Sequence, residues 1–142
     1  MLAKRVLGER FAQPLDGGAT WRDGRPLLGP SKTIRGVVLA ILCTEVVGLA
    51  FGLPLFQGAV IGAASMAGDV LSSFVKRRLG LDSSSRALGL DQVPEALLPA
   101  LAAKGVLGLD WIGVLLVVAL FFLIELAASR VLFRLGIREQ PY

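Results

Sequence analysis

LFQGAVIGAASMAGDVLSSFV, residues Leu55–Val75, is the segment that decides the fold class of this chain. It is close to the roughly 20 residues that a helix needs to cross a bilayer, and Asp69 is its only charged residue. Small and polar residues recur at intervals of three or four and form one stripe: Gly58, Gly62, Ser65, Asp69, Ser72, Ser73 and, just beyond the segment, Lys76. We predict a transmembrane helix whose stripe faces protein or water.

Three further apolar stretches extend this interpretation. Gly36–Leu53 precedes Pro54 and predicts, with the first segment, a helical hairpin over residues 36–75. A weaker stretch, Val93–Leu109, and a strongly apolar one, Trp111–Phe133, predict a second helical pair over residues 93–133. Residues 1–33 and 76–92 are polar and predict loops, the first after a short basic helix. The expected fold is all-α: a polytopic integral membrane protein with about four transmembrane helices in a single domain, residues 1–142.

Composition supports a membrane protein and excludes several kinds of site. Of 142 residues, 54% are hydrophobic and 18% charged, which leaves too little polar surface for a soluble globule. Without histidine, the chain cannot use a histidine base or a histidine metal site. Its single cysteine excludes an internal disulfide and a cysteine-built zinc site. Residues 1–11 are too charged for a cleaved signal peptide.

Positive charge is distributed very unevenly along the chain. If all four stretches cross, residues 1–35, 76–92 and 130–142 share one side and carry 14 of the 15 Lys and Arg residues, which leaves only Lys104 opposite. The positive-inside rule makes the loaded side cytoplasmic. We expect a cell-membrane protein with cytoplasmic polar loops, whose basic surface favours anionic partners other than nucleic acid.

Acidic residues on that side are candidate metal ligands. An unpaired Asp69 at the edge of the hydrocarbon would cost at least about 2.5 kcal/mol, so it should pair with a cation or a metal. Asp91 and Asp16 lie in the two polar segments, and carboxylates with phosphate and water suit Mg²⁺. The alternative for Asp69 is a structural ion pair with Lys76 or a loop arginine.

Basic residues lie at two helix ends. Ser31 is the expected N-cap of the first helix, which would put Lys32 and Arg35 on one face of its first turn. These two cations, with the free N–H groups of the helix N-terminus, would form a phosphate-binding site. The alternative is that both residues only anchor the helix at the membrane surface. At the end of the second helix, cations before Gly80 suit either lipid headgroups or a substrate phosphate; they are Lys76, Arg77 and Arg78.

Three motifs together resemble the CDP-archaeol synthase family, relatives of phosphatidate cytidylyltransferase. They are PLDGGATWRDGRPLLGPSKTIRG (Pro14–Gly36), GDVLSSFVKRRLGL (Gly68–Leu81) and GLDQ (Gly89–Gln92). The resemblance covers most of the chain. It implies transfer of a cytidylyl group from CTP to a lipid phosphate, with release of pyrophosphate and a requirement for Mg²⁺.

The resemblance also implies roles for individual residues. Asp69 and Asp91, with Asp16, would hold the metal, and Lys32 and Arg35 the triphosphate. Lys76 and Arg77 would hold the lipid phosphate or pyrophosphate, and we expect Asp69, Lys76 and Lys32 to be catalytic. The remaining substrate-binding residues would be Thr33, Gly36, Ser73 and Gln92.

Two features depart from the family pattern. A second Asp often follows the Gln by two residues, where this chain has Pro94, and members usually begin with another hydrophobic helix. The sequence leaves open whether the acceptor is an archaeal ether lipid phosphate or phosphatidic acid, and whether copies of the chain associate. The main rival function is a small transporter or channel using Glu45, Asp69 and Glu125, and the other is an inactive lipid-binding scaffold.

Overall fold

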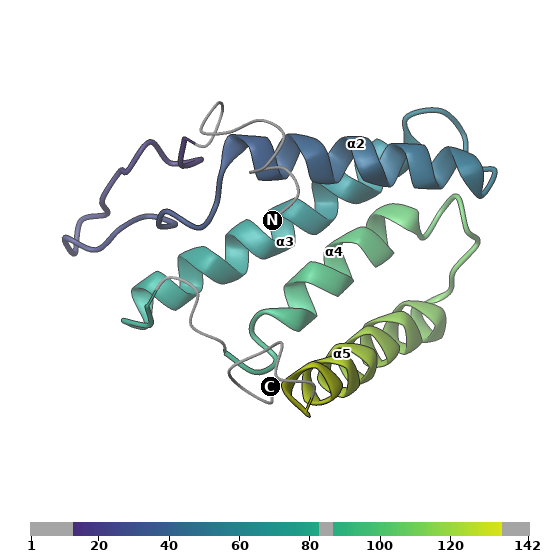
Figure 1. Cartoon of the computed structure of the whole chain (residues 1–142). Coiled ribbons are helices and arrows are strands. Elements are labelled where there is room, and N and C mark those ends of the chain that lie inside the picture. Colours follow the sequence, from purple (N-terminus) through teal and green to yellow (C-terminus); the bar gives the residue numbers. More distant parts are fainter. Residues whose placement is uncertain (1–12, 83–86, 135–142) are drawn as a thin grey trace.

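The computed structural model describes residues 13–82 and 87–134, and this part of the chain is all-helical apart from its N-terminal loop (Figure 1). Successive helices pack against one another, α2 on α3, α3 on α4 and α4 on α5. Their bounds are α2 Ile34–Ala50, α3 Gln57–Arg78, α4 Gln92–Ala103 and α5 Trp111–Arg134. The all-α prediction is confirmed, whereas the predicted basic helix in residues 1–11 lies outside the described residues.

The N-terminal loop, residues 13–33, doubles back on itself before α2 begins. Isolated β-bridges join Pro14 to Thr33 and Thr20 to Pro26. The Leu15 N–H donates to the Lys32 carbonyl at 2.7 Å, which fixes the end of the loop to its beginning. The loop lies beside the C-terminal end of α3 (Figure 1), so it brings its side chains to that end of the bundle.

Glycines on α3 allow close contact with both neighbouring helices. A Cβ on Gly58 would lie 2.6 Å from the Thr44 carbonyl oxygen of α2, and one on Gly62 would lie 3.0 Å from the Thr44 Cβ. A Cβ on Gly68 would overlap the Pro94 carbonyl of α4. The first part of the stripe, with Gly58 and Gly62, therefore lets neighbouring helices pack closely, as small residues do in membrane helix bundles.

The helices differ in whether they are long enough to cross a membrane. Of the helices described, α3 and α5 are long and apolar enough to cross a membrane. The 12-residue α4 is only about 18 Å long at 1.5 Å per residue, against about 30 Å of hydrocarbon. The stretch predicted to cross, Val93–Leu109, is thus helical only to Ala103, and four crossings stay a prediction.

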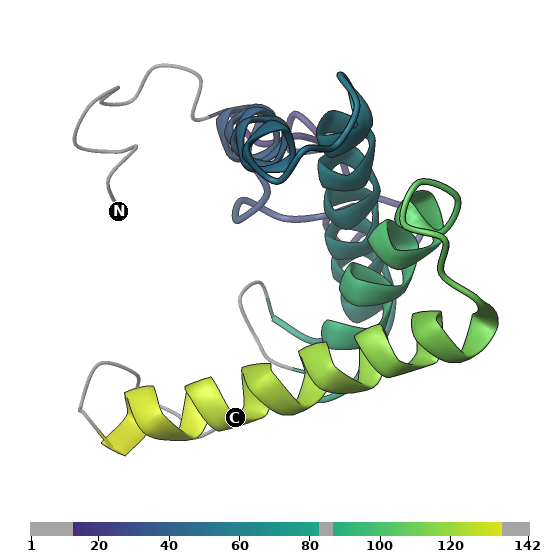
Figure 2. The same cartoon turned by 90° about the vertical axis from the view of Figure 1, so that its right-hand side faces the viewer.

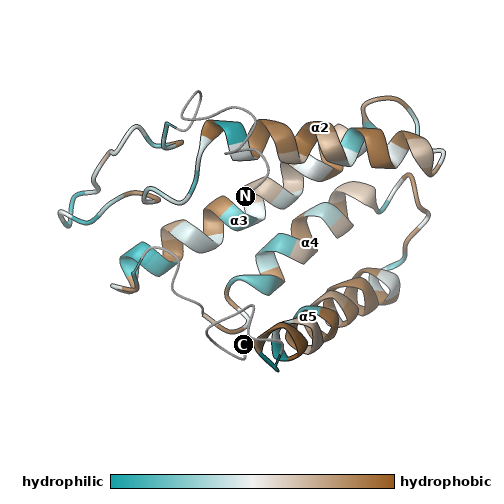
Figure 3. Ribbon diagram, in the orientation of Figure 1, coloured by the Kyte–Doolittle hydropathy of each residue, from teal (hydrophilic) through white to brown (hydrophobic). Residues whose placement is uncertain are grey.

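The helices differ in hydropathy and direction. Figure 3 shows α5 and most of α2 as strongly hydrophobic, and the N-terminal loop and the C-terminal end of α3 as more hydrophilic. Figure 2 shows α5 crossing the other helices steeply and extending away from them.

One predicted helix boundary was wrong and another was confirmed. Thr33, not Ser31, is the N-cap of α2: its backbone is extended and its Oγ1 accepts the Gly36 N–H at 3.2 Å. The end of the second helix expected at Gly80 is confirmed: α3 ends at Arg78, and Gly80 has a φ of +76°. The helix therefore extends three residues into the polar segment predicted for residues 76–92. Three basic residues in the last turn of α3 favour this extension, since they oppose the negative end of the helix dipole.

Candidate active site

Asp69 on α3 forms an ion pair with Lys32 at the end of the N-terminal loop. The Lys32 Nζ lies 2.5 Å from Asp69 Oδ1 and 2.6 Å from Oδ2. The two side chains retain 21% and 27% of their accessible surface, so a ligand can still reach them. The expectation that Asp69 pairs with a cation is confirmed, although the partner is neither Lys76 nor an arginine.

A second lysine–aspartate pair joins α3 to the start of α4. The Lys76 Nζ lies 2.7 Å from Asp91 Oδ1, and the Lys76 side chain is only 9% exposed. The loop before α4 is ordered by its own side chains, because Asp91 Oδ2 accepts the Ala87 N–H at 3.2 Å and Gln92 Oε1 accepts the Gly89 N–H at 2.7 Å. Gln92 thus positions the loop that carries Asp91.

The helical repeat places both pairs along one side of α3. Asp69 and Lys76 are seven residues apart, which is two turns or about 10 Å of helix. Ser72 and Ser73 lie between them on the same face and are almost completely buried, and the Ser72 hydroxyl donates to the Asp69 carbonyl at 2.9 Å. The second half of the stripe, from Asp69 to Lys76, therefore carries both ion pairs.

Two cavities lie at this end of the molecule. One, of about 210 Å³, is lined by residues that include Lys32, Thr33, Gly36 and Asp69. The other, of about 300 Å³, is lined by Arg25, Arg77 and Asp82, among others. Arg77 is 6% exposed, and its Nη2 donates to the Asp82 carbonyl at 2.5 Å. Within the described residues its buried Nε has no hydrogen-bond partner, which leaves one donor of this guanidinium unsatisfied.

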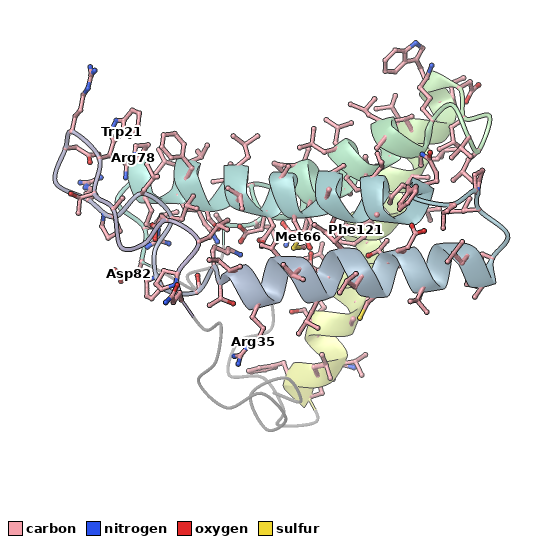
Figure 4. All side chains as sticks on the ribbon, turned by 90° about the horizontal axis from the view of Figure 1, so that it is seen from above. Trp21, Arg35, Met66, Arg78, Asp82 and Phe121 are labelled. Atoms are coloured by element: carbon pink, nitrogen blue, oxygen red, sulfur yellow. The ribbon has the colours of Figure 1, made fainter. Side chains whose placement is uncertain are left out.

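Arg25 and Arg78 join the N-terminal loop to α3, a contact that the sequence analysis missed. Arg25 Nη1 donates to the Arg78 carbonyl at 3.0 Å, while Arg78 Nη2 donates to the Pro26 carbonyl at 2.6 Å. Arg78 also pairs with Asp23 at 3.1 Å. Its guanidinium lies 5.1 Å from the Phe74 ring centroid and 5.8 Å from that of Trp21 (Figure 4). In the sequence, the only signal for this contact is the aromatic and turn residues of WRDGR, residues 21–25, and these residues do not indicate which part of the chain they would contact.

Arg35 does not join Lys32 on one face, so that expectation was wrong. Lys32 precedes the N-cap, whereas Arg35 lies in the first turn of α2 and points away from α3 (Figure 4). Its predicted binding of the triphosphate stays a prediction.

Asp16 acts locally on the backbone. Its Oδ2 accepts the Leu28 and Gly29 N–H groups at 2.8 and 3.2 Å, and its Oδ1 accepts the Gly18 N–H at 3.0 Å. Partial burial alone would raise the pKa of this carboxyl, but the hydrogen bonds outweigh it and hold the pKa below its usual range. Both oxygens are engaged in shaping the loop, and the predicted metal ligation by Asp16 stays a prediction.

Metal binding by this site would depend on a ligand that brings its own oxygens. Across residues 13–82 and 87–134, no group of three or more acidic or cysteine side chains is arranged to hold an ion. Mg²⁺ commonly uses only one or two carboxylates together with phosphate and water. Asp69 and Asp91 offer that chemistry, since both keep about a quarter of their side-chain surface exposed.

Both carboxylate oxygens of Glu45 bind backbone N–H groups, which weakens the transporter alternative. Its Oε1 accepts the Phe56 N–H at 2.8 Å and its Oε2 the Ala59 N–H at 2.7 Å, so it caps the start of α3. It lies 13 residues beyond Lys32, about 20 Å along the direction of α2. Glu125, on α5, is half-buried.

Known proteins similar in sequence are CDP-archaeol synthases. The chain is 45% identical over 87 residues to that of Methanopyrus kandleri, an alignment covering 57% of this chain and 50% of the relative. It is 38% identical to that of Hyperthermus butylicus, with 88% and 81% covered, and 36% identical to that of Aeropyrum pernix, with 92% and 79% covered. The chain spans about half the length of the relatives from Methanopyrus kandleri and Thermococcus kodakarensis.

A solved structure and a family model extend this similarity. The structure is described as an intramembrane enzyme for archaeal membrane lipid biosynthesis; it is 34% identical, has a TM-score of 0.69 and is matched over 89% of this chain and 84% of its own. The model for CarS-like CDP-archaeol synthases matches residues 5–142. Sequence, fold and site together therefore lead to one conclusion: the chain belongs to the CarS-like CDP-archaeol synthase family.

Proposed function

We propose that this protein is a CTP-dependent cytidylyltransferase of the membrane that forms a CDP-activated lipid, of the CDP-archaeol type, from a lipid phosphate. The observation that carries the proposal is the arrangement of two lysine–aspartate pairs along one side of α3. The four residues come from the three separate motifs that identify the family, so the fold assembles them from distant parts of the sequence.

The reaction exchanges one phosphoanhydride bond for another. An oxygen of the lipid phosphate attacks the α-phosphorus of CTP, the bond from the α-phosphorus to the bridging oxygen breaks, and pyrophosphate leaves with that oxygen. The second pKa of a phosphomonoester is about 6, so the acceptor is already largely dianionic at pH 7 and needs no general base. The chain has no histidine, which is consistent with this chemistry.

Charge neutralisation is then the main task of the protein. Lys32 and Lys76 each face a carboxylate at 2.5–2.7 Å, and their ammonium groups are positioned to turn toward phosphate oxygens. Arg77 lines the cavity of about 300 Å³ and supplies a third cation for the lipid phosphate or the departing pyrophosphate. Thr33 and Gly36 line the Lys32 cavity at the start of α2, where the positive end of the helix dipole favours a bound phosphate.

Asp69 and Asp91 would hold Mg²⁺ together with substrate phosphates, and Asp16 is a weaker candidate because its oxygens serve the backbone. When bound, the ion would neutralise charge on the phosphates and help align attacking and leaving oxygens. The carboxylates would be released for this role as the lysines move to phosphate.

The site would face the cytoplasm, where CTP is available. If α2, α3, α5 and the segment that contains α4 all cross the membrane, 14 of the 15 Lys and Arg residues lie on the same side as the site. The acceptor would reach the site from within the bilayer, and an isoprenoid ether lipid phosphate is the proposed natural one.

The test is synthesis of CDP-lipid by the purified protein. CTP labelled in its α-phosphate is incubated with Mg²⁺ and either an archaeal ether lipid phosphate or phosphatidic acid. The proposal expects a labelled lipid from the wild type, at the higher rate with the ether lipid, and at least a 100-fold lower rate from Asp69→Asn. Matched thermal unfolding of the two proteins would separate loss of chemistry from loss of fold.

Two results would contradict this proposal. Absence of labelled lipid with every acceptor would remove the activity, and ion flux in proteoliposomes that depends on Asp69 would favour transport. Unchanged synthesis by Asp69→Asn would remove only that residue from the mechanism.

A further inference from the structure

The aromatic ring of Trp21 lies on the outside of α3, at the basic end of that helix. It packs edge-on against Phe74, with the ring centroids 5.5 Å apart and the ring planes at 85°. The Arg78 guanidinium lies 5.8 Å from the Trp21 ring centroid, and Figure 4 shows both side chains at the same end of α3. Trp21 is still 46% exposed. The N-terminal loop therefore presents a large, mostly apolar ring to its surroundings.

This ring lies on the face of α3 opposite the candidate active site. Leu71, Phe74 and Arg78 follow one another at intervals of three and four residues and so share one face of the helix. Arg78 comes two residues after Lys76, which places it about 200° further around the axis. Of the described helices, only α2 and α4 contact α3, and Leu71 remains 48% exposed. Because α3 is long and apolar enough to cross a membrane, this open face adjoins lipid.

The position of Trp21 along α3 coincides with a change from apolar to basic residues. Phe74 lies in the last apolar turn of the helix, and the turn that follows carries Lys76, Arg77 and Arg78. Tryptophan is enriched at such boundaries, because its ring is apolar while its N–H can donate to a headgroup oxygen. Arg22, the next residue in the loop, is exposed. An aromatic ring and a cation are thus adjacent at the level where α3 leaves the hydrocarbon.

The turn that carries Trp21 is ordered by contacts within the protein. The Trp21 N–H donates to the Arg25 carbonyl at 2.9 Å, and Asp23 Oδ1 accepts the Arg25 N–H at 3.1 Å. Asp23 also pairs with Arg78, so its charge is compensated and Arg22 adds a net positive charge to this surface. Because the turn is already ordered, binding to a membrane surface costs little conformational entropy.

We propose that Trp21 and Arg22 form a docking surface for the headgroup layer of the bilayer and that this surface prefers anionic phospholipids. The indole ring lies at the level of the lipid carbonyl groups, and the Arg22 guanidinium binds phosphate oxygens. The contact holds the loop that carries Lys32 at the membrane surface. It requires that α3 span the bilayer, but it does not depend on the proposed catalytic activity.

The first test measures the depth of Trp21 in the bilayer. The chain has two tryptophans, so Trp111→Phe leaves Trp21 as the only indole fluorophore. This variant is reconstituted in vesicles of phosphatidylcholine that is brominated either near the carbonyl end or near the methyl end of its chains. Bromine near the carbonyl end should quench Trp21 about threefold more strongly. If Trp111→Phe folds poorly, the difference in fluorescence between the wild type and Trp21→Phe gives the same quantity.

The second test measures the preference for anionic lipid. Phosphatidylglycerol and phosphatidylcholine, each brominated near the carbonyl end, are compared as equal minor components of vesicles of unbrominated phosphatidylcholine. Phosphatidylglycerol should quench Trp21 about twice as strongly, and Arg22→Gln in the Trp111→Phe background should remove this preference. Arg130→Gln is the matched control, because it removes the charge of an exposed arginine on α5 and should keep the preference.

Several results would overturn the docking surface. Stronger quenching by bromine near the methyl end would place Trp21 in the hydrocarbon, and quenching by aqueous acrylamide but not by brominated lipid would place it in water. Equal quenching by the two lipids, or a preference that survives Arg22→Gln, would remove the anionic partner. A disulfide between two copies through Trp21→Cys, in a Cys43→Ala background, would instead make the surface an interface between copies. None of these measurements uses CDP-lipid synthesis, so each outcome leaves the proposed function standing.

Discussion

Acidic side chains at the two ends of the α2–α3 pair are stabilised in different ways. At the turn between the helices, Glu45 accepts hydrogen bonds from the backbone N–H groups of Phe56 and Ala59. At the opposite end, Asp69 and Asp91 face the ammonium groups of Lys32 and Lys76. All three carboxylates have partners, but only Asp69 and Asp91 have a lysine partner that can move.

This difference separates a structural acid from a functional one. Backbone N–H groups cannot leave Glu45 without unwinding the start of α3, where Phe56 has a φ of +67° and provides no side-chain cap. A lysine has a flexible side chain and can exchange a carboxylate for a phosphate. The end with mobile partners is therefore the end where anions and a divalent cation can be bound and released.

The largest effect is expected from removing one of the exchangeable cations. Lys76→Met should lower kcat/KM about 100-fold, because a charge that stabilises the transition state is lost and Asp91 is left without its partner. The measurement is CDP-lipid synthesis by the variant at saturating and limiting CTP.

The double variant Lys76→Met/Asp91→Asn distinguishes function from structure. If the pair served only to hold α3 and α4 together, removing both charges would recover much of the activity, since no buried charge remains unpaired. We expect the double variant to be at least as inactive as the worse single one.

Changing the fixed acid should affect stability and spare chemistry. Glu45→Leu leaves two N–H groups without an acceptor and should lower the free energy of unfolding by about 2 kcal/mol, and Glu45→Gln should lower it less. Thermal unfolding in detergent measures both. The rate of synthesis per folded molecule should stay within twofold of the wild type, and an inactive but stable Glu45→Gln would refute the structural role.

Much of this comparison could be predicted from the sequence. The 3.6-residue period placed Asp69 and Lys76 on one stripe, and the cost of an unpaired intramembrane acid required a partner for Asp69. The all-α class followed from long apolar segments. These predictions worked because each depends on spacing within a single helix.

Predictions that required contacts between distant segments were less successful. The partner of Asp69 is 37 residues away in a loop, and no local pattern specifies that Lys32 rather than a nearby cation will reach it. The N-cap of α2 was placed at Ser31 because Ser31 and Thr33 are chemically equivalent caps, and the β-bridge at Thr33 decides between them. The short α4 was overestimated because its apolar residues continue past the point where the helix ends.

A smaller effect is expected from loosening the loop that carries Lys32. Arg78→Lys keeps the charge at this position but loses the fork that joins Asp23 and the Pro26 carbonyl, as well as the stacking on Phe74 and Trp21. We expect KM for CTP to rise about fivefold with kcat within twofold, because the loop must be ordered when the nucleotide binds. Initial rates at varied CTP check this. A lowered unfolding temperature with unchanged KM would show that the contact serves stability alone.

The smallest effect concerns Asp16, an acid near the site whose partners are fixed like those of Glu45. Because hydrogen bonds lower the pKa of Asp16 in the folded protein, its stabilising effect is complete above the ordinary value of 3.8 and is lost as the pH falls through the lower folded value. Hydrogen exchange of the Leu28 and Gly29 N–H groups, corrected for intrinsic rates, should therefore be constant from pH 7 to about pH 5. Asp16→Asn should raise it about threefold at pH 7, since a neutral amide oxygen is a weaker acceptor. Synthesis of CDP-lipid should fall less than fivefold in this variant. A loss as large as that of Asp69→Asn would instead assign Asp16 to the metal. It would also show that a carboxylate with backbone partners can exchange them for a metal ion.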